Sequence, residues 1–447
     1  MTAPVKVLIV DPGGELGGAE RVADILARRA DRRRFNPMVA CLSRGSWPRT
    51  LAADGVPVRV VATPARFRQI AGVVSTVARL ARLVRREEIE VLHGQLGAGA
   101  FYATLAGRLS GARVVWHLYD PQSTWDLRRR LFARLILLLG ADHVVFANPL
   151  VASSWAPILE GSSTPTSTSL PGIDLEEISD GDPKDARELL GVSGDVPLVC
   201  MFARPEPHKQ HETVVRAASI VRSRFPDCKF VLGTAWDGPD SEFVENLKTL
   251  AKQVGSEANV VLPGGVSDTT KAGLLVGSTL VVHPSSFEPY GLAILEGMAA
   301  GKPVIAADTD GARLLIEDGI SGVLVPKQDH VALAEAIIAL LLDPDRRERL
   351  GSAARRRAAR FTVAEMVKGV EQVWEGVTSP SANGLTRPTR SLWRRRSQCS
   401  PRRSPSAQQR LLGESDLGVL GGRGVSHPGH ATMPAFRGSQ REAQVGG

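Results

Sequence analysis

The sequence predicts an α/β protein made of two successive parallel sheets covered by helices, followed by a tail without a pattern. Short apolar runs alternate with amphipathic helical patterns, which is typical of parallel sheets packed under helices. This alternation is interrupted once, near the middle of the chain. The chain has 447 residues, more than the roughly 100–200 residues of one domain. We therefore expect two domains that face each other across a cleft.

The strands of the two expected domains are short runs rich in Val, Ile and Leu. Helical patterns separate them, such as residues 19–30 and 71–88. The first series of strands is expected at residues 6–11, 37–42, 58–62, 91–95, 113–118 and 143–148. The second series is expected at residues 198–203, 229–235, 259–264, 280–284, 303–308 and 322–326.

Composition places the boundaries between these parts. Residues 159–185 are rich in Ser, Thr, Pro, Gly and Asp, so we interpret them as the hinge between the domains. The predicted parts are a first domain at 1–175, a second domain at 176–360, a C-terminal helix at 361–377 that returns toward the first domain, and a tail at 378–447. The tail is rich in Arg, Ser, Pro and Gly and has no apolar pattern, which predicts disorder.

Charge and cysteine usage narrow the class of protein. The net charge of +8 is accounted for by residues 378–447, where eleven arginines face three acidic residues. The other 377 residues are neutral, so their charge does not indicate a nucleic-acid partner. The four cysteines have no metal-like or redox-like spacing. With no apolar run of about 18–20 residues and no signal-peptide pattern, we expect a cytoplasmic protein.

The segment SFEPYGLAILEGMAAGKPVI, residues 286–305, carries the strongest functional pattern. Here a strand is followed by a tight loop with Glu288 and by a helix that begins near Gly291. The first N–H groups of that helix, at Gly291 and Leu292, are expected to face an anion such as a diphosphate. Glu296 lies five residues further along, roughly 7 Å at the helical rise of about 1.5 Å per residue. That distance suits a carboxylate that accepts hydrogen bonds from a ribose diol.

Residues 285–329 closely resemble the donor-site segment of retaining GT-B glycosyltransferases of family 4, and the resemblance extends in order over residues 5–377. It implies two Rossmann-like domains and a nucleoside-diphosphate sugar as donor, bound without a metal or another cofactor. It also implies that Glu288 contacts hydroxyls of the transferred sugar, that Glu296 binds the ribose, and that the amides of Gly291 and Leu292 bind the phosphates.

Two basic residues match the family's diphosphate ligands. Arg204 follows a strand and Lys209 lies five residues on, where cations stabilise the charge of the departing nucleoside diphosphate. The sequence departs from the family pattern here, since Ala203 and Gln210 replace the usual glycines. Val266, in the segment GGVSD, matches a loop beside the nucleotide base.

The first domain supplies the other candidates. Gly17 and Gly18 lie between a strand and a helix, where glycine allows close approach of a ligand and a positive φ. His117 is expected at the carboxyl end of a strand, where open α/β sheets bind ligands. By resemblance, these glycines, His117 and the neighbouring Asp120 face the donor's phosphate or sugar. His117 and Glu288 are the predicted catalytic residues.

Other patterns do not support a function. Asp308 and Asp310 spell DxD, but they follow a strand where the family has an ordinary loop, so we expect no metal. His208 and His211 lack a third ligand at a suitable spacing for zinc. A nicotinamide-dependent oxidoreductase would need a complete GxGxxG, which the first domain lacks.

The expected function is sugar transfer to an acceptor hydroxyl of a glycan, glycolipid or small molecule, and the alternative is a non-catalytic scaffold that binds sugar nucleotides. Basic helices in the first domain, including residues 126–140, are compatible with a lipid-linked or polysaccharide acceptor and with peripheral association at the inner membrane face.

Overall fold

The computed structural model describes residues 3–61, 70–122, 126–192, 196–234 and 241–379. The predicted tail lies outside the described residues from residue 380 onward. The described chain forms two sheets in which every paired strand is parallel. Most of these strands are buried on both faces, which explains their continuous apolar sequences.

The first sheet has seven strands in the order β3-β2-β1-β4-β5-β6-β7. Their bounds are Val5–Asp11 (β1), Phe35–Cys41 (β2), Val58–Val60 (β3), Val91–Gln95 (β4), Arg113–Leu118 (β5), His143–Phe146 (β6) and Thr166–Thr168 (β7). The helices are Gly18–Arg29 (α1), Trp47–Ala53 (α2), Ile70–Arg86 (α3), Leu96–Ser110 (α4), Leu127–Gly140 (α5) and Pro149–Leu159 (α6). We call these elements, together with α16 below, the first lobe.

The second sheet has six strands in the order β10-β9-β8-β11-β12-β13. Their bounds are Leu198–Phe202 (β8), Lys229–Thr234 (β9), Val260–Gly265 (β10), Leu280–His283 (β11), Val304–Ala307 (β12) and Val323–Val325 (β13). The helices are Leu175–Ser179 (α7), Pro183–Leu189 (α8), the 3-10 turn Pro207–Lys209 (η1), His211–Val221 (α9), Ser241–Gln253 (α10), Asp268–Gly277 (α11), Leu292–Ala299 (α12), Asp310–Leu315 (α13), His330–Leu342 (α14) and Pro344–Ala358 (α15). These elements form the second lobe.

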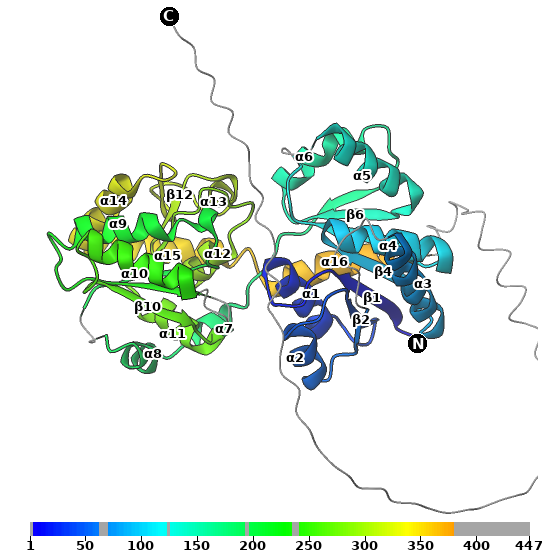
Figure 1. Ribbon diagram of the computed structural model, residues 1–447, viewed down its shortest axis with the longest axis horizontal. Coiled ribbons are helices and arrows are strands. Elements are labelled where there is room, and N and C mark those ends of the chain that lie inside the picture. Colours follow the sequence, from blue (N-terminus) through cyan, green and yellow to red (C-terminus); the bar gives the residue numbers. More distant parts are fainter. Residues whose placement is uncertain (1–2, 62–69, 123–125, 193–195, 235–240, 380–447) are drawn as a thin grey trace, which may run out of the picture. The chain divides into compact units, whose positions relative to one another are not determined.

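The last described helix, α16 (Val363–Thr378), belongs to the first lobe although it follows the second lobe in sequence. Its buried residues, among them Val370 and Trp374, share a core with α1 and with Val7 and Ile9 of β1. Figure 1 shows α16 beside α1 and the central strands β1 and β4. Helices α3 to α6 contribute to the core on the other face of the sheet.

The chain passes between the lobes twice, and the two passages run side by side. Ile173 forms an isolated parallel bridge with Thr362, with hydrogen bonds of 3.0 and 3.1 Å to the backbone of Phe361 and Val363. A Cβ atom on Gly172 would lie 2.2 Å from the Thr362 carbonyl oxygen, so the close approach of the passages requires a glycine.

The predicted hinge at residues 159–185 is wrong over most of its length. It contains strand β7, which pairs with β6 at the edge of the first sheet, and helix α7, which is capped by Asp174. A three-residue edge strand rich in threonine has no apolar run that the sequence pattern would detect. The connection itself is confined to about residues 169–174.

Candidate functional site

The Glu288 carboxylate lies in the loop that follows β11 and is held by two side chains. Lys209 Nζ donates to its Oε2 at 2.7 Å, and His283 Nε2 donates to the same oxygen at 2.8 Å. Burial alone would raise the pKa of Glu288, but the hydrogen bond from His283 and the charge of Lys209 outweigh burial and lower this pKa to about 2. Glu288 is therefore a fixed anion, and both of its protein donors contact one oxygen.

Helix α12 begins where the sequence analysis expected it. Gly291 is its N-cap with φ at 101°, in the left-handed region, and no side chain caps the helix. A Cβ atom at this position would lie 2.9 Å from Ile294 Cδ1. Because no side chain caps the helix, the backbone N–H groups from Leu292 onward are available to bind an anion.

Glu296 lies on α12 and forms a buried ion pair that the sequence analysis did not foresee. Lys271 Nζ of α11 donates to its Oε1 at 2.8 Å, and the two side chains are 7% and 9% exposed. Lys271 also lies 3.6 Å from Asp268. The second carboxylate oxygen of Glu296 remains available to a ligand hydroxyl.

The remaining candidates of the second lobe surround the same strand ends. Arg204 lies two residues after the end of β8, is half exposed and pairs with Glu206 at 3.1 Å. Val266 is half-buried and packs against the core that includes Phe202. Arg204 and Lys209 both follow β8, so the structure keeps the two predicted cations on one loop.

In the first lobe, the glycine pair does not use the positive φ that glycine allows. Gly17 has φ at −114°, and Gly18 is not among the residues with positive φ. A Cβ atom on Gly17 would meet the Glu20 carboxylate at 2.6 Å, whereas nothing lies within 4 Å of one on Gly18. The close approach to backbone is at Gly14 instead, where a Cβ atom would lie 2.2 Å from the Arg44 carbonyl oxygen.

The carboxyl ends of three adjacent strands bring together buried polar groups that are not fully paired. Asp11 is the last residue of β1, Gln95 is the last residue of β4, and His117 is the next-to-last residue of β5. All three side chains are fully buried. Asp11 Oδ2, Gln95 Nε2 and His117 Nε2 have no hydrogen-bond partner among the described residues. Such groups are rare in protein interiors, so each indicates a ligand or a water at this edge.

The environment of Asp11 and His117 shifts the pKa of each toward its uncharged form. Burial, together with the nearby Glu20, raises the pKa of Asp11 to about 7. Burial lowers the pKa of His117 well below its usual value. Tyr119 stacks on His117 with 4.6 Å between ring centres, and its hydroxyl donates to Gln95 at 2.6 Å. Asp120 is exposed beyond the strand, and its backbone carbonyl accepts hydrogen bonds from Gln122 and Trp155.

The patterns that were set aside as metal ligands have other partners. Asp308 binds Arg313 at 2.6 Å, His208 lies 3.3 Å from Glu206, and His211 packs edge-on against Phe243. Within the described part of the chain, no group of three His, Cys, Asp or Glu side chains is placed to hold a metal ion.

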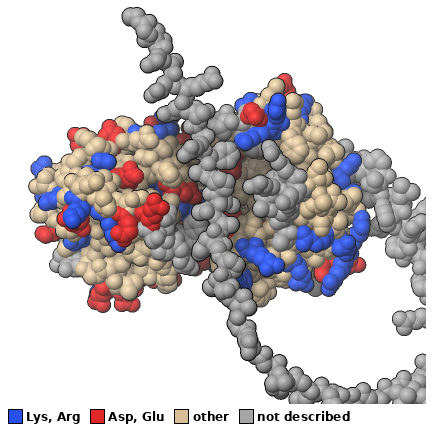
Figure 2. Space-filling model, viewed as in Figure 1, with Lys and Arg blue, Asp and Glu red and all other residues tan. Residues whose placement is uncertain are grey.

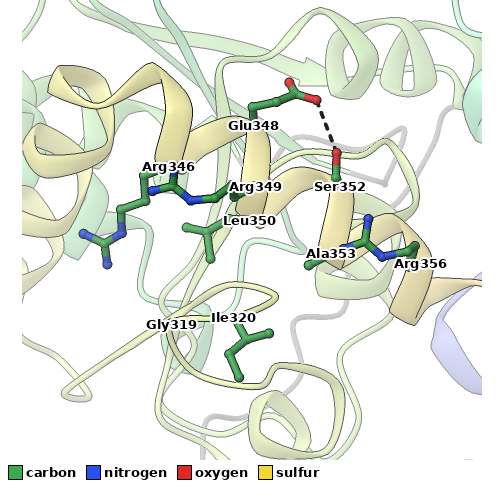
Figure 3. Close-up of a pocket in the computed structure, with 9 residues that line it drawn as sticks. All are labelled: Gly319, Ile320, Arg346, Glu348, Arg349, Leu350, Ser352, Ala353 and Arg356. Atoms are coloured by element: carbon green, nitrogen blue, oxygen red, sulfur yellow. Dashed lines mark hydrogen bonds between the residues drawn. The ribbon is translucent and has the colours of Figure 1, made fainter.

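A hollow of about 600 Å³ lies elsewhere in the second lobe, between α15 and the loop before β13. Figure 3 shows Ile320 and Leu350 facing this space, and Glu348 accepting a hydrogen bond from Ser352 at 3.2 Å. None of the predicted site residues lines it. We therefore assign the candidate site to the strand ends and not to this hollow.

Several residues of the site were missed by sequence reasoning: Asp11, His93, Gln95, Lys271 and His283. Asp11 and His283 had a detectable signal, because Asp11 ends a predicted strand and His283 is the next-to-last residue of another, each before a loop that carries candidates. Lys271 had none, because its partner Glu296 is 25 residues away and only the packing of α11 on the sheet brings them together.

A glycosyltransferase family model matches each of the two lobes. Residues 16–177 match the family model described as glycosyltransferase family 4. Residues 183–357 match the model described as glycosyl transferases group 1.

Curated relatives include a D-inositol 3-phosphate glycosyltransferase from Frankia alni, 34% identical over 283 residues, which are 62% of this chain and 68% of the relative. A second protein of that name, from Nocardia farcinica, is 31% identical over 51% of this chain and 53% of its own length. An alpha-D-kanosaminyltransferase from Streptomyces kanamyceticus is 29% identical over 64% of this chain and 78% of the relative.

Solved structures share the fold. The chain matches HepE of Anabaena, solved with UDP and glucose, with a TM-score of 0.72 and 24% identity over 83% of this chain and 99% of HepE. It matches a glycosyltransferase from Rickettsia africae with a TM-score of 0.74 and 20% identity, over 85% of this chain and all of the other.

Proposed function

The chain belongs to the GT-B glycosyltransferases of family 4, and we propose that it transfers a sugar with retention, and without a metal, from a nucleoside-diphosphate sugar to an acceptor hydroxyl. The observation that carries this proposal is the cluster of Lys209, His283 and Glu288 beside the uncapped start of α12. A cation, a fixed carboxylate and free backbone N–H groups are the groups that a nucleotide sugar requires.

Each group has a defined task in this proposal. The N–H groups at the start of α12 bind the diphosphate, favoured by the positive end of the helix dipole. Arg204 and Lys209 balance the charge that grows on the diphosphate as it leaves. Glu288 accepts hydrogen bonds from hydroxyls of the transferred sugar, while Lys209 and His283 keep it ionised. Glu296 accepts from the ribose with the oxygen that Lys271 does not occupy.

The transfer step balances without a protein nucleophile. The bond between the anomeric carbon and the phosphate oxygen breaks, and the acceptor oxygen forms its bond on the same face. The acceptor's proton passes to the departing phosphate oxygen. The protein supplies orientation and charge stabilisation only, so no residue becomes covalently modified during turnover.

The test is release of nucleoside diphosphate by the full chain from a panel of UDP-, GDP- and ADP-sugars, with the anomeric configuration of the product read by NMR. Retention of configuration with one donor, undiminished by a chelator, supports the proposal. An inverted product contradicts the retaining mechanism. Binding of a donor without turnover, with any acceptor offered, favours the non-catalytic scaffold instead.

For the acceptor, we propose a polyhydroxyl compound that carries a negative charge. The first lobe offers unpaired polar atoms at its strand ends, which suit hydroxyl groups. Residues 1–175 carry 22 basic against 14 acidic residues, whereas residues 176–377 carry 22 against 30, so the neutral body divides into halves of +8 and −8. Inositol phosphate, suggested by the names of two relatives, is the first acceptor to test.

An anionic membrane is the second candidate partner of the first lobe. Helix α5 buries Ala133, Ile136 and Leu137 but is also apolar on its outer side. Its exposed large apolar side chains are Leu127, Leu131, Phe132, Leu135 and Leu138, each more than half exposed. Arg128, Arg129, Arg130 and Arg134 lie among them. Figure 2 shows basic side chains gathered over this lobe.

We propose that this outer side of α5 docks on a bilayer with anionic lipid, because apolar side chains enter the interface while arginines bind the headgroups. Among the described helices, none is both long and apolar enough to cross a membrane.

Co-sedimentation with phosphatidylglycerol and phosphatidylcholine vesicles tests the docking. We expect binding to the anionic vesicles and its loss in Leu131→Glu/Leu135→Glu. Leu189→Glu is the matched control, since Leu189 is 69% exposed on α8 of the second lobe. If the double variant binds the anionic vesicles as strongly as Leu189→Glu does, α5 has no role in docking.

A further inference from the structure

Three buried ring side chains form a hydrogen-bonded chain from α16 to the end of β5. Trp374 Nε1 lies 2.9 Å from Nδ1 of His93, and His93 Nε2 lies 3.2 Å from Nδ1 of His117. All three side chains are fully buried. At the far end, His117 Nε2 has no partner among the described residues.

The direction of this chain follows from Trp374, because an indole N–H donates and does not accept. His93 Nδ1 must therefore accept, so the single proton of neutral His93 is on Nε2. That N–H donates to Nδ1 of His117, which places the proton of His117 on Nε2. Burial keeps both rings neutral: it lowers the pKa of His93 to about 3 and, together with His93, lowers the pKa of His117 as well.

We propose that Trp374 and His93 are positioning residues that hold His117 in the tautomer with its proton on Nε2, so that His117 donates a hydrogen bond to an oxygen of the bound substrate. The opposite tautomer would present a lone pair there, which accepts a hydrogen bond but cannot donate one. This inference rests on the proposed function, since it needs a sugar or acceptor oxygen beside His117.

Two further contacts support a positioning role. Tyr119 stacks on His117 and Phe35 packs edge-on against Trp374 at 5.3 Å between ring centres, so the rings at both ends of the chain are fixed. An N–H group buried without a partner costs free energy in the unliganded protein. A substrate oxygen at His117 would recover that cost on binding.

The first arm of the test reads the tautomer directly and does not depend on turnover. In the full chain with 15N-labelled histidine, the nitrogen shifts of His117, assigned by their loss in His117→Gln, are expected to report a proton on Nε2. In Trp374→Phe, which keeps an aromatic ring but removes the N–H, we expect a mixture of both tautomers. An unchanged tautomer in this variant overturns the proposal.

The matched control is Trp116→Phe. Trp116 is buried on β5 next to His117 in sequence, and its indole N–H donates to Thr104 at 2.9 Å. This substitution removes a comparable buried hydrogen bond without touching the histidines. We expect it to leave the His117 tautomer and the transfer rate unchanged. If Trp116→Phe shifts the tautomer as strongly as Trp374→Phe, the assignment to Trp374 is wrong.

The second arm measures transfer. We expect Trp374→Phe to lower kcat about 5- to 30-fold, the effect of one lost hydrogen bond. Affinity for the nucleoside diphosphate alone should not change, because the second lobe binds it. A shifted tautomer with unchanged kcat contradicts the donor role of His117.

Two substitutions of His93 distinguish the loss of its hydrogen bonds from a general effect on folding. In His93→Gln, the amide oxygen can accept from Trp374 and the amide nitrogen can donate to His117, so we expect this variant to retain more of the His117 tautomer and of kcat than His93→Leu. Equal spectra for the two variants overturn the proposal. If the wild-type chain transfers no sugar from any donor, the proposed function fails, and the nitrogen shifts still decide the tautomer.

Discussion

The two lobes present opposite kinds of polar group at the carboxyl ends of their strands. In the second lobe the carboxylates are charged and paired, as in the contacts of Glu288 with Lys209 and of Glu296 with Lys271. In the first lobe the groups are buried and incompletely paired, as for Asp11 Oδ2 and His117 Nε2. Two sheets of the same architecture therefore differ in the chemistry that they offer a ligand.

This difference suggests how the substrates are divided between the lobes. A diphosphate carries charge and needs cations and helix N–H groups, which the second lobe holds ready. A sugar or polyol offers neutral hydroxyl groups, which pair best with neutral donors and acceptors. The following predictions test the comparison, from the largest expected effect to the smallest.

The largest effect is expected for the charged cluster of the second lobe. Glu288→Gln removes the charge that Lys209 and His283 hold in place, so kcat/KM should fall about 100- to 1,000-fold, as measured by release of nucleoside diphosphate. Asp308→Asn is the control, because its pair with Arg313 is exposed and such pairs contribute only about 0–1 kcal/mol. Equal activity of Glu288→Gln and wild type would show that the cluster is structural.

The lobes should also respond to pH in opposite directions. The pKa of Asp11 is raised to about 7 in the folded state, so its contribution to stability is full below about pH 4 and is lost as the pH rises through 7. The pKa of Glu288 is lowered to about 2, so its contribution is full above about pH 4.5 and is lost as the pH falls toward 2.

Urea unfolding followed by tryptophan fluorescence measures the first effect, because Trp47, Trp116, Trp155 and Trp374 all lie in the first lobe. Asp11→Asn should remove a decrease on the order of 3 kcal/mol between pH 4 and 8. Asp227→Asn, an exposed acid of the second lobe, should leave the decrease unchanged. The same slope in wild type and Asp11→Asn would mean that another group causes it.

A smaller effect is expected at the start of α12. Gly291→Ala places a Cβ at φ 101° and 2.9 Å from Ile294 Cδ1, which should cost about 2 kcal/mol of unfolding free energy and weaken nucleoside diphosphate binding. Gly319→Ala is the control, since φ there is 71° with nothing within 4 Å. It should cost about 1 kcal/mol and leave binding unchanged, as calorimetry of both variants would show.

The smallest effect is expected at Gln210, where φ is 60°. Gln210→Gly relieves the left-handed conformation but loses hydrogen bonds to Pro207 at 2.9 Å and Thr213 at 3.1 Å. The two changes nearly cancel, so the unfolding free energy should change by less than about 1 kcal/mol. Gln210→Ala loses the bonds and keeps the strain, so it should be the less stable variant. The reverse order contradicts this account.

The sequence predicted twelve of the strands because buried parallel strands are apolar along their length. Strand β7 was not predicted, because Thr166–Thr168 is a short edge strand in a Ser- and Thr-rich segment. Its pairing depends on β6, which no local pattern reveals.

The site residues also divide into those that the sequence predicted and those that it did not. Glu288 and Glu296 were found because loop and helix signals surround them in one stretch of sequence, and Lys209 because it follows a predicted strand and matches the family pattern. The contact between Trp374 and His93 spans 281 positions, and Lys271 meets Glu296 only through the packing of α11. Contacts of this kind arise from the folded topology, and residue type at one position does not encode them. At Gly17 the nearby Glu20 carboxylate, and not a positive φ, requires the glycine.

The return of α16 to the first lobe has a consequence for synthesis. All seven strands of the first sheet precede residue 170 and are synthesised first. Helix α16, which packs on Val7, Ile9 and Phe35, is synthesised nearly 200 residues later. During that interval the second lobe can fold while part of one face of the first sheet is covered by α1 and α2 but not by α16. Exposed apolar surface of this kind is a binding site for chaperones. A chain that stops before Val363 would contain both sheets and still lack a closed first lobe.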